Sequence, residues 1–332
     1  MPKISVIIAL TTKENISNLC FESLTQQTFD DFECLCVQQN TLEEYPAIME
    51  LIKKDSRFKL LKTPSSNPSK WDCYNEALYQ IKGEYVLFLN DTDLLHLQAL
   101  DIFSDALRYS HAQIASAERT IFSSSKKLKA QKQKIPFDKS ILKKRNQNFL
   151  TDFWQGNPFQ INGFLEGKIF TAELISYLKF HTNLREFSPY FFMEQAYSLI
   201  KHCVYIKYPL CFLRKEAHIP ALYSFETLKD LKERITFEYA YFIEVGRISG
   251  YSSLVLRRKC SQDVFNAIKH VVLHTPESTF ICINQQLINL VLEIKNYGLL
   301  QGLSLSFYQK TIIFLLIRNK LSLVKKILRL FS

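Results

Sequence analysis

The chain has 332 residues, of which 47% are hydrophobic and 13% aromatic, which is ample material for a packed core and excludes a disordered protein. Eight glycines and ten prolines exclude collagen-like and linker-like classes. The net charge of +10 is local, because residues 126–145 hold nine Lys or Arg residues against Asp138 alone. The length predicts two domains, or one α/β domain with an appendage.

Short apolar runs alternate with helical patterns in the first third of the chain. This alternation predicts an α/β fold with a Rossmann-like, doubly wound and mostly parallel sheet. Ligands of such sheets bind beyond the carboxyl ends of the strands, so the residues after each run are the first candidates for a site. The apolar runs are Ile4–Leu10, Phe32–Val37, Phe58–Leu61 and Glu84–Leu89, and the helical patterns are Asn15–Leu24, Tyr45–Lys54, Trp71–Ile81 and Leu97–Tyr109.

The rest of the chain contains a polar, Lys-rich segment, two further strand-like runs and a helical C-terminal part. Residues 123–148 are polar and rich in Lys, and we predict a mobile loop or an extended arm. Strand-like runs return at Lys168–Phe170 and Val204–Ile206. We therefore predict an α/β domain over residues 1–220 and a helical subdomain over 221–332. The helices expected there are Phe225–Ile248, Gln262–Leu273, Gln285–Lys295 and Phe307–Leu330.

The eight cysteines form no CxxC pair, and most of them lie in apolar stretches. We interpret them as buried, reduced thiols of a cytoplasmic protein, with a metal cluster as the alternative. Met1-Pro2-Lys3 leads straight into a predicted strand, so we expect no signal peptide. No apolar run approaches the ~18 residues that span a bilayer.

Three stretches together resemble the family-2 glycosyltransferases of the GT-A fold, over roughly the first 220 residues. The first joins ISVIIAL to the pattern L-C-x-x-S-L-x-x-Q-T-F-x-x-F-E, which ends at Glu33. The second joins W-D-C-Y-N-E-A-L to K-G-E-Y-V-L-F-L-N, with Asn67 and Asn75 eight residues apart. The third comprises Glu166–Phe170 and Tyr205–Arg214, which are similar to acceptor-side segments.

The resemblance implies transfer of a sugar from a nucleotide-sugar, with UDP favoured, to a surface glycan such as lipopolysaccharide or capsule. It also implies a divalent cation, Mn²⁺ or Mg²⁺, held by carboxylate oxygens against the donor diphosphate. The family's acidic motif aligns with Phe88–Asp93, where Thr92 replaces the usual Asp. A shift of one residue makes Asp91 and Asp93 a D-x-D metal pair. The alternative is that both are solvated turn residues and helix N-caps.

The same resemblance implies a set of donor-binding positions. Gln38 stands where the family has an acidic residue, and its amide can hydrogen-bond a base without supplying charge. Asp72 and Asn75 lie one helical turn apart, so they either position the diphosphate or brace the acidic loop. His218 follows an Arg-containing strand end, where some members place a third metal ligand, and a structural histidine is the alternative. The donor-binding candidates are Thr11, Gln38, Asp72, Asn75, Asn90 and Asp91.

The candidate general base is Glu194, in the segment Phe192-Met193-Glu194-Gln195. The family carries a Glu-Asp pair there, and Tyr197 favours the register that places Glu194 on the Asp. The other register places Gln195 on the Asp and removes the base. A first-turn helix carboxylate, favourable beside the positive end of the dipole, is the structural alternative.

The last helix, residues 318–331, is basic on one face and apolar on the other. Its stripe of Leu321, Val324, Leu328 and Phe331 predicts peripheral contact with the anionic inner face of the cytoplasmic membrane, beside a lipid-linked acceptor. The alternative is packing on the helical subdomain. Residues 126–145 either bind phosphates or form a soluble loop, and their lack of interleaved aromatics argues against a nucleic-acid partner. A catalytically silent relative that binds a glycan or a partner enzyme is the second functional hypothesis.

Overall fold

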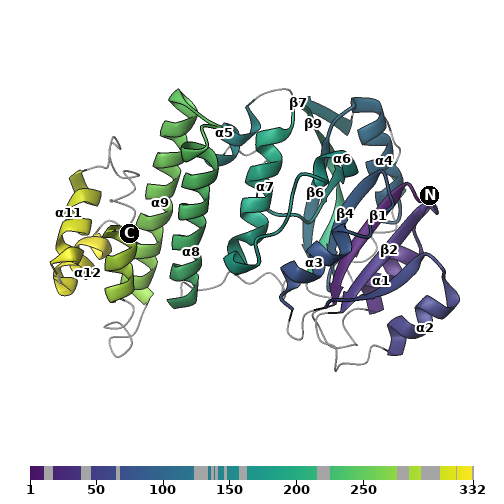
Figure 1. The fold of residues 1–332 in the computed structure, drawn as a ribbon, viewed down its shortest axis with the longest axis horizontal. Helices are drawn as coiled ribbons and strands as arrows, with labels where there is room; N and C mark the ends of the chain where they lie inside the picture. The colour runs from purple at the N-terminus through teal and green to yellow at the C-terminus, as the bar shows by residue number, and fades with distance from the viewer. Residues whose placement is uncertain are drawn as a thin grey trace. The chain divides into compact units, whose positions relative to one another are not determined.

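The structure is a computed structural model, and it divides into two compact units, Met1–Ile219 and Pro220–Ser332 (Figure 1). The first unit is α/β, and the second is helical. The residues described are 1–10, 18–38, 46–64, 68–122, 134–135, 138, 141–145, 148–156, 163–214, 225–274, 284–292, 307–318 and 320–330.

The four predicted apolar runs form parallel strands in the first half of the sheet, and the structure gives their order as β3-β2-β1-β4. Every residue of β1 and β2 is buried, because helices cover a parallel sheet on both faces. The α/β prediction is confirmed. The strands are β1 (Ile4–Leu10), β2 (Phe32–Gln38), β3 (Phe58–Lys62) and β4 (Tyr85–Asn90), and the helices between and after them are α1 (Asn18–Thr25), α2 (Pro46–Lys54), α3 (Lys70–Leu78) and α4 (Ala99–Ser110).

The second half of the sheet mixes directions. Strand β8 pairs antiparallel with β4 and with β6, and β6 runs parallel to β9. Strand β7 pairs antiparallel with β9 although it lies in the Lys-rich segment that we predicted to be a loop or an arm. Backbone pairing along β9 needs no apolar side chain, so composition gave no signal of it. These strands are β5 (Leu94–Leu95), β6 (Ile114–Phe122), β7 (Leu142–Arg145), β8 (Lys168–Thr171) and β9 (Cys203–Arg214).

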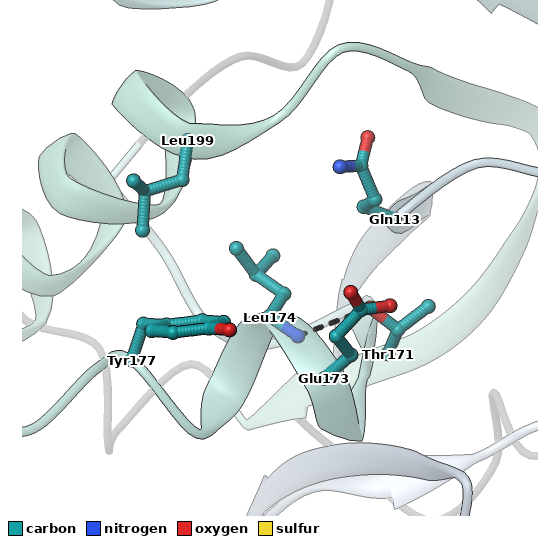
Figure 2. Close-up of a pocket in the computed structure, with 6 residues that line it drawn as sticks. All are labelled: Gln113, Thr171, Glu173, Leu174, Tyr177 and Leu199. Atoms are coloured by element: carbon teal, nitrogen blue, oxygen red, sulfur yellow. Dashed lines mark hydrogen bonds between the residues drawn. The ribbon is translucent and has the colours of Figure 1, made fainter.

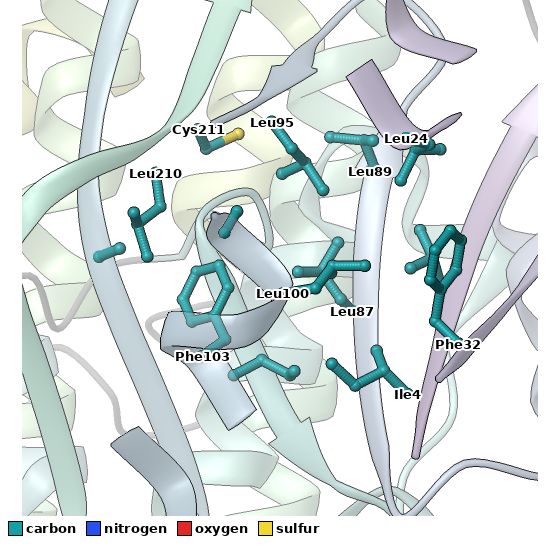
Figure 3. Close-up of a cluster of buried hydrophobic side chains, with 14 of the residues drawn as sticks. Ile4, Leu24, Phe32, Leu87, Leu89, Leu95, Leu100, Phe103, Leu210 and Cys211 are labelled. Atoms are coloured by element: carbon teal, nitrogen blue, oxygen red, sulfur yellow. The ribbon is translucent and has the colours of Figure 1, made fainter. Parts of the chain in front are cut away.

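Apolar side chains fill both faces of this sheet. On one face, Leu100 and Phe103 of α4 pack with Leu87 of β4 and Leu210 of β9 (Figure 3). On the other, Phe88 of β4 lies among aromatic rings that include Phe180 and Phe192, whose ring centroids are 4.2 Å apart. The elements beside this aromatic cluster are α5 (Phe149–Trp154), α6 (Ala172–Ile175), the 3₁₀ helix Thr182–Phe187 and α7 (Ser188–Leu199).

Buried charges join two helices of the second unit. Nε of Arg234 in α8 and Nζ of Lys259 in α9 lie 3.1 and 2.9 Å from Oε1 of Glu238, which is fully buried. Lys259 also pairs with Asp263 at 3.3 Å. The helices are α8 (Phe225–Glu238), a π-helical turn (Tyr239–Glu244), α9 (Gly250–His274), residues 284–292, α11 (Phe307–Ile317) and α12 (Leu321–Leu330).

The C-terminal stripe is not a membrane face, which corrects our expectation. Val324 and Leu328 are fully buried, because α12 packs on α9 and α11. The predicted helix Phe307–Leu330 is also two helices and not one. The side chain of Leu321 and all of Phe331 lie outside the described residues. Among the residues that are described, no helix combines the length and the apolar character needed to cross a membrane.

Seven of the eight cysteines fall in the described ranges, and all seven are buried free thiols, as the sequence predicted. Burial raises the pKa of Cys20, Cys34, Cys211 and Cys260. Within the described ranges, no three His, Cys, Asp or Glu side chains are placed to hold a metal ion together.

Candidate active site

Two predicted positions, Gln38 and Asn90, flank the end of β1 at the carboxyl edge of the sheet. Strand β1 runs between β2 and β4, so that Leu10 pairs with Gln38 and Ala9 pairs with Asn90. Gln38 and Asn90 are both buried, at 5% and 8% exposure. Thr11 follows Leu10 in the sequence but lies outside the described residues, as do Thr12, Gln39 and Asn40.

Asn90 connects three chain segments through its side-chain amide. Its Nδ2 donates to Oδ2 of Asp93 at 2.7 Å and to Oε1 of Glu166 at 2.9 Å. Its Oδ1 accepts a hydrogen bond from Nζ of Lys70. The sequence predicts a donor-binding role for Asn90 but none for Lys70, and it predicts Glu166 only as part of an acceptor-side segment. The sequence held one signal for Lys70. A lysine at the first position of a helix is unfavourable beside the positive end of the helix dipole, so its presence there points to a role outside the helix.

Asp91 and Asp93 are buried, at 1% and 0% exposure, so they are not the solvated turn residues of the alternative interpretation. Nor do they cap α4, which begins at Ala99 with Gln98 as its N-cap. Oδ1 of Asp93 accepts from the backbone N–H of Arg214 at 2.9 Å, and Nε of Arg214 donates to the carbonyl of Thr92 at 3.4 Å. The end of β9 therefore holds the acidic turn, Asn90–Asp93, in place.

The polar residues of the first motif support this turn from α1. Their spacing places them on one face of α1 and the turn that follows it, and that face contacts the segment after β4. The motif thus encodes a brace for residues 90–100. The bonds are Cys20 Sγ to Asn90 O (3.4 Å), Leu95 N to Ser23 Oγ (3.2 Å), Gln27 Nε2 to His96 O (2.8 Å), Leu100 N to Gln27 Oε1 (3.1 Å) and Thr28 N to Leu97 O (3.0 Å).

Asp72 and Asn75 both make bracing contacts. Oδ2 of Asp72 accepts from the N–H and the hydroxyl of Ser69, at 2.8 and 2.7 Å, in a capping box at the start of α3. The amide of Asn75 donates to the carbonyl of Phe180 and accepts from its N–H, both at 2.8 Å. These bonds fix the start of α3 and join the helix to the chain at Phe180.

Glu194 lies in the second turn of α7 and is fully buried, so it is not a first-turn carboxylate. Its Oε1 accepts a hydrogen bond of 2.6 Å from Nε1 of Trp154 in α5. Phe192 of the same helix packs on Phe88 of β4 with ring centroids 5.8 Å apart, which places α7 beside the strand that ends in Asn90. His218 lies outside the described residues.

Residues 5–165 match the family model described as Glycosyl transferase family 2. This stretch is a family 2 glycosyltransferase domain. The fold agrees with it. The structure of Staphylococcus aureus TarS residues 1–349 matches with a TM-score of 0.69 and 14% identity, covering 99% of this chain and 91% of that one. Its complex with UDP-GlcNAc matches equally, with a TM-score of 0.69 and the same coverage. At this identity, the likeness shows a common GT-A fold.

Two curated relatives match shorter stretches. One is the GalNAc(5)-diNAcBac-PP-undecaprenol beta-1,3-glucosyltransferase of Campylobacter jejuni, 26% identical over 34% of this chain and 37% of that protein. The other is the poly(ribitol-phosphate) beta-glucosyltransferase of Bacillus spizizenii, 28% identical over 30% of this chain and 16% of that protein. The matched stretches therefore span well under half of either relative's length.

The acidic turn of the glycosyltransferase domain suits a hard divalent cation in its chemistry. Asp91 and Asp93 offer carboxylate oxygens, which Mg²⁺ and Mn²⁺ prefer over nitrogen or sulfur. Magnesium sites commonly use one or two protein carboxylates and complete the coordination with substrate phosphates and water. Such a site needs no third protein carboxylate or histidine, so the pair fits a cation that arrives with a diphosphate.

A separate pocket of about 210 Å³ lies away from this site (Figure 2). Thr171, which lines it, pairs with Tyr85 at the amino end of β4, whereas Asn90 is at the carboxyl end. The pocket is thus at the opposite edge of the sheet from the candidate site. Its lining residues are Gln113, Thr171, Glu173, Leu174, Tyr177 and Leu199.

Proposed function

We propose that the chain transfers a hexosyl group from a UDP-sugar to a glycan acceptor in bacterial surface-polymer synthesis. The observation that carries the proposal is the buried turn Asn90–Asp93 at the carboxyl end of β4, inside a family 2 glycosyltransferase domain. Ligands of parallel sheets bind at this edge. The crystal structures of TarS with UDP and with UDP-GlcNAc support a uridine nucleotide as the donor.

In this proposal, the donor lies across the ends of β1, β2 and β4. Thr11 and Gln38 contact the nucleoside, and the Gln38 amide hydrogen-bonds the base without needing a charge. Asn90 and Asp91 face the diphosphate, while Asp72 and Asn75 hold α3 in position behind it. Asp91 and Asp93 bind Mn²⁺ or Mg²⁺, with His218 as a third ligand. When bound, the cation neutralises charge on the departing UDP.

The base in this proposal is Glu194. The indole of Trp154 holds one of its carboxylate oxygens, which is how an orienting group fixes a catalytic base. Glu194 accepts the proton of the acceptor hydroxyl while the acceptor oxygen forms a bond to the anomeric carbon. The bond from that carbon to the UDP oxygen breaks in the same displacement. This arrangement is the one expected for an inverting transfer.

The acceptor class rests on the relatives. The names of the Campylobacter and Bacillus enzymes specify a diphosphate-linked lipid oligosaccharide and a phosphate-containing polymer. We accordingly propose a lipid-linked or polymeric glycan acceptor, and a cytoplasmic enzyme working at the inner face of the cytoplasmic membrane. Acceptor sites are built on variable loops, so the fold itself does not select the acceptor.

Two uncharged residues at the candidate site favour a second function, binding without catalysis. Gln38 and Thr92 carry no charge where the family pattern has carboxylates. Both lie at the candidate site, at the end of β2 and in the acidic turn. A domain with these replacements can bind a glycan or a partner enzyme without transferring a sugar.

Two measurements separate these functions. The first is the melting temperature with UDP and Mn²⁺, with ADP and Mn²⁺ as the control. A ligand at 100 times its Kd stabilises the folded state by about 2.7 kcal/mol, so UDP should raise the melting temperature and ADP should not. No rise with any nucleoside diphosphate would contradict the donor site. The second is hydrolysis of a panel of UDP-sugars, because turnover of one sugar identifies the enzyme, whereas binding without turnover identifies the silent relative.

A further inference from the structure

The last two helices carry apolar side chains that the helical unit does not bury. Phe314, Ile317 and Leu323 are 52%, 38% and 45% exposed, although Ile312 and Leu316 of α11 are buried at 0% and 1%. The two sets alternate at helical spacing, so α11 presents one apolar face inward and a second one outward. Large exposed apolar side chains that gather in one place mark an interaction surface.

The outward side chains of α11 and α12 lie at the junction of the two helices. Phe314 and Ile317 are in the last turn of α11, and Leu323 is in the first turn of α12. A backbone hydrogen bond from Lys320 N to Leu315 O, 2.9 Å long, closes the connection between the helices. The three exposed side chains therefore lie within a few residues of one short connection, between two helices that pack together.

Basic side chains accompany these apolar ones, and acidic ones do not. The guanidinium carbon of Arg318 lies 4.5 Å from the ring centroid of Phe314. Lys320 precedes Leu323 by three residues and Lys326 follows it by three, and both lysines are exposed. Residues 299–332 contain six Lys or Arg residues and no Asp or Glu. An anionic partner therefore meets no repulsive charge on this segment.

We propose that this junction, formed by Phe314, Ile317, Arg318, Lys320, Leu323 and Lys326, docks peripherally on an anionic lipid surface. The charges favour a membrane over a second copy of the chain, because two such junctions facing one another would repel. Interfacial helices bind membranes in this way: their apolar side chains enter the headgroup region, and their basic side chains lie beside the lipid phosphates. The inference holds whether or not the glycosyltransferase domain transfers a sugar.

The test is cosedimentation of the full chain with vesicles of phosphatidylglycerol and phosphatidylcholine, and with vesicles of phosphatidylcholine alone. One variant combines Arg318→Gln, Lys320→Gln and Lys326→Gln. Each basic residue near an anionic surface contributes about fivefold to the partition coefficient, so this variant should bind on the order of a hundredfold more weakly. A second variant combines Phe314→Ser, Ile317→Ser and Leu323→Ser, and it should also bind more weakly.

A matched control removes the same charge elsewhere, by Lys53→Gln, Lys179→Gln and Lys207→Gln, all at exposed positions of the first unit. It should bind the anionic vesicles as the wild type does, and high salt should release both. Equal loss in the control and in the Arg318 variant would overturn the proposal, because net charge alone would then explain binding. Unchanged vesicle binding by either the Arg318 variant or the Phe314 variant would also overturn the proposal.

Sedimentation velocity without lipid tests the rival occupant. A concentration-dependent dimer that the Phe314 variant abolishes, with vesicle binding unaltered, would assign the junction to a second copy and overturn the membrane proposal. UDP binding to the same variants, measured by calorimetry, should equal that of the wild type. A wild type that binds vesicles but not UDP would reject the donor proposal and leave this one standing.

Discussion

Nε1 of Trp154 donates a hydrogen bond of 2.6 Å to Oε1 of Glu194, and both side chains are buried, at 6% and 0% exposure. The two residues come from α5 and α7, which pack together, and α7 also packs on β4 through Phe192 and Phe88. A carboxylate held by an indole has one oxygen fixed in direction. This relationship makes Glu194 testable as a base by a substitution that preserves the bond.

Glu194→Gln should lower turnover by about 10²- to 10⁴-fold while UDP affinity stays at the wild-type value. The glutamine oxygen still accepts from Trp154, but it cannot take a proton from the acceptor. The comparison variant is Glu166→Gln, which should weaken UDP binding because Glu166 contacts Asn90. Turnover and UDP affinity measured on both variants decide the matter. Wild-type turnover in the Glu194 variant, with the loss found in the Glu166 variant instead, would move the base to Glu166.

Asp91→Asn and Asp93→Asn should each sharply reduce the dependence of UDP binding on Mn²⁺, because an amide oxygen carries no negative charge and holds a hard cation less tightly than a carboxylate does. The amide variants are preferable to alanine, since an amide oxygen keeps one of the two hydrogen bonds that Asp93 accepts, from Asn90 and from the backbone of Arg214. Calorimetry with and without Mn²⁺ gives the result, with Asp101→Asn in α4 as the matched control. A Mn²⁺ dependence equal to that of the wild type in both site variants would rule out the acidic turn as the metal site.

Lys70→Met should weaken UDP binding by about tenfold to a hundredfold, the range for losing one hydrogen bond to a charged group. Uridine binding should be unaffected, because the ammonium of Lys70 is directed to Asn90, at the expected position of the diphosphate. Lys53→Met, at an exposed position in α2, is the control. If UDP and uridine affinities fall equally, Lys70 only supports the shape of the site through Asn90.

Glu33→Gln should destabilise the chain by about 1–3 kcal/mol at pH 7. Burial of Glu33 opposes its charged form, but hydrogen bonds from Lys59, from Ser5 and from the backbone of Lys82 hold its pKa below the usual value. The donor–acceptor distances to Oε1 and Oε2 are 2.7 to 2.8 Å. The mutational effect should therefore be full above about pH 4.3, the value for an unfolded Glu, and disappear as pH falls through the folded pKa.

Urea unfolding across this pH range provides the measurement, and Glu84→Gln provides the control. Glu84 also pairs with a lysine, Lys3, but its side chain is 63% exposed, so its loss should cost about 0–1 kcal/mol. Equal destabilisation by the two variants at pH 7 would show that burial gives the Glu33 contacts no special weight.

Sequence alone determined the four parallel strands and the edge at which Gln38, Asn90, Asp91 and Asp93 lie. That inference works because an apolar run forms a buried strand through short-range preferences, and the carboxyl ends of parallel strands share one edge. Tertiary structure alone decided the partners of these residues. Lys70 and Glu166 reach Asn90 from 20 and 76 residues away, and Arg214 reaches Asp93 from 121.

The last helix is a second case in which the sequence predicts an element but not its contacts. Its sequence predicts an amphipathic helix, because apolar residues recur at three- and four-residue spacing. The same apolar stripe can pack against a lipid surface or against a protein core, since both are apolar. Only the packing of α12 on α9 and α11 shows that Val324 and Leu328 belong to the core, while Phe314, Ile317 and Leu323 face outward. Periodicity reports which side chains share a face, and the position of neighbouring helices decides what that face contacts.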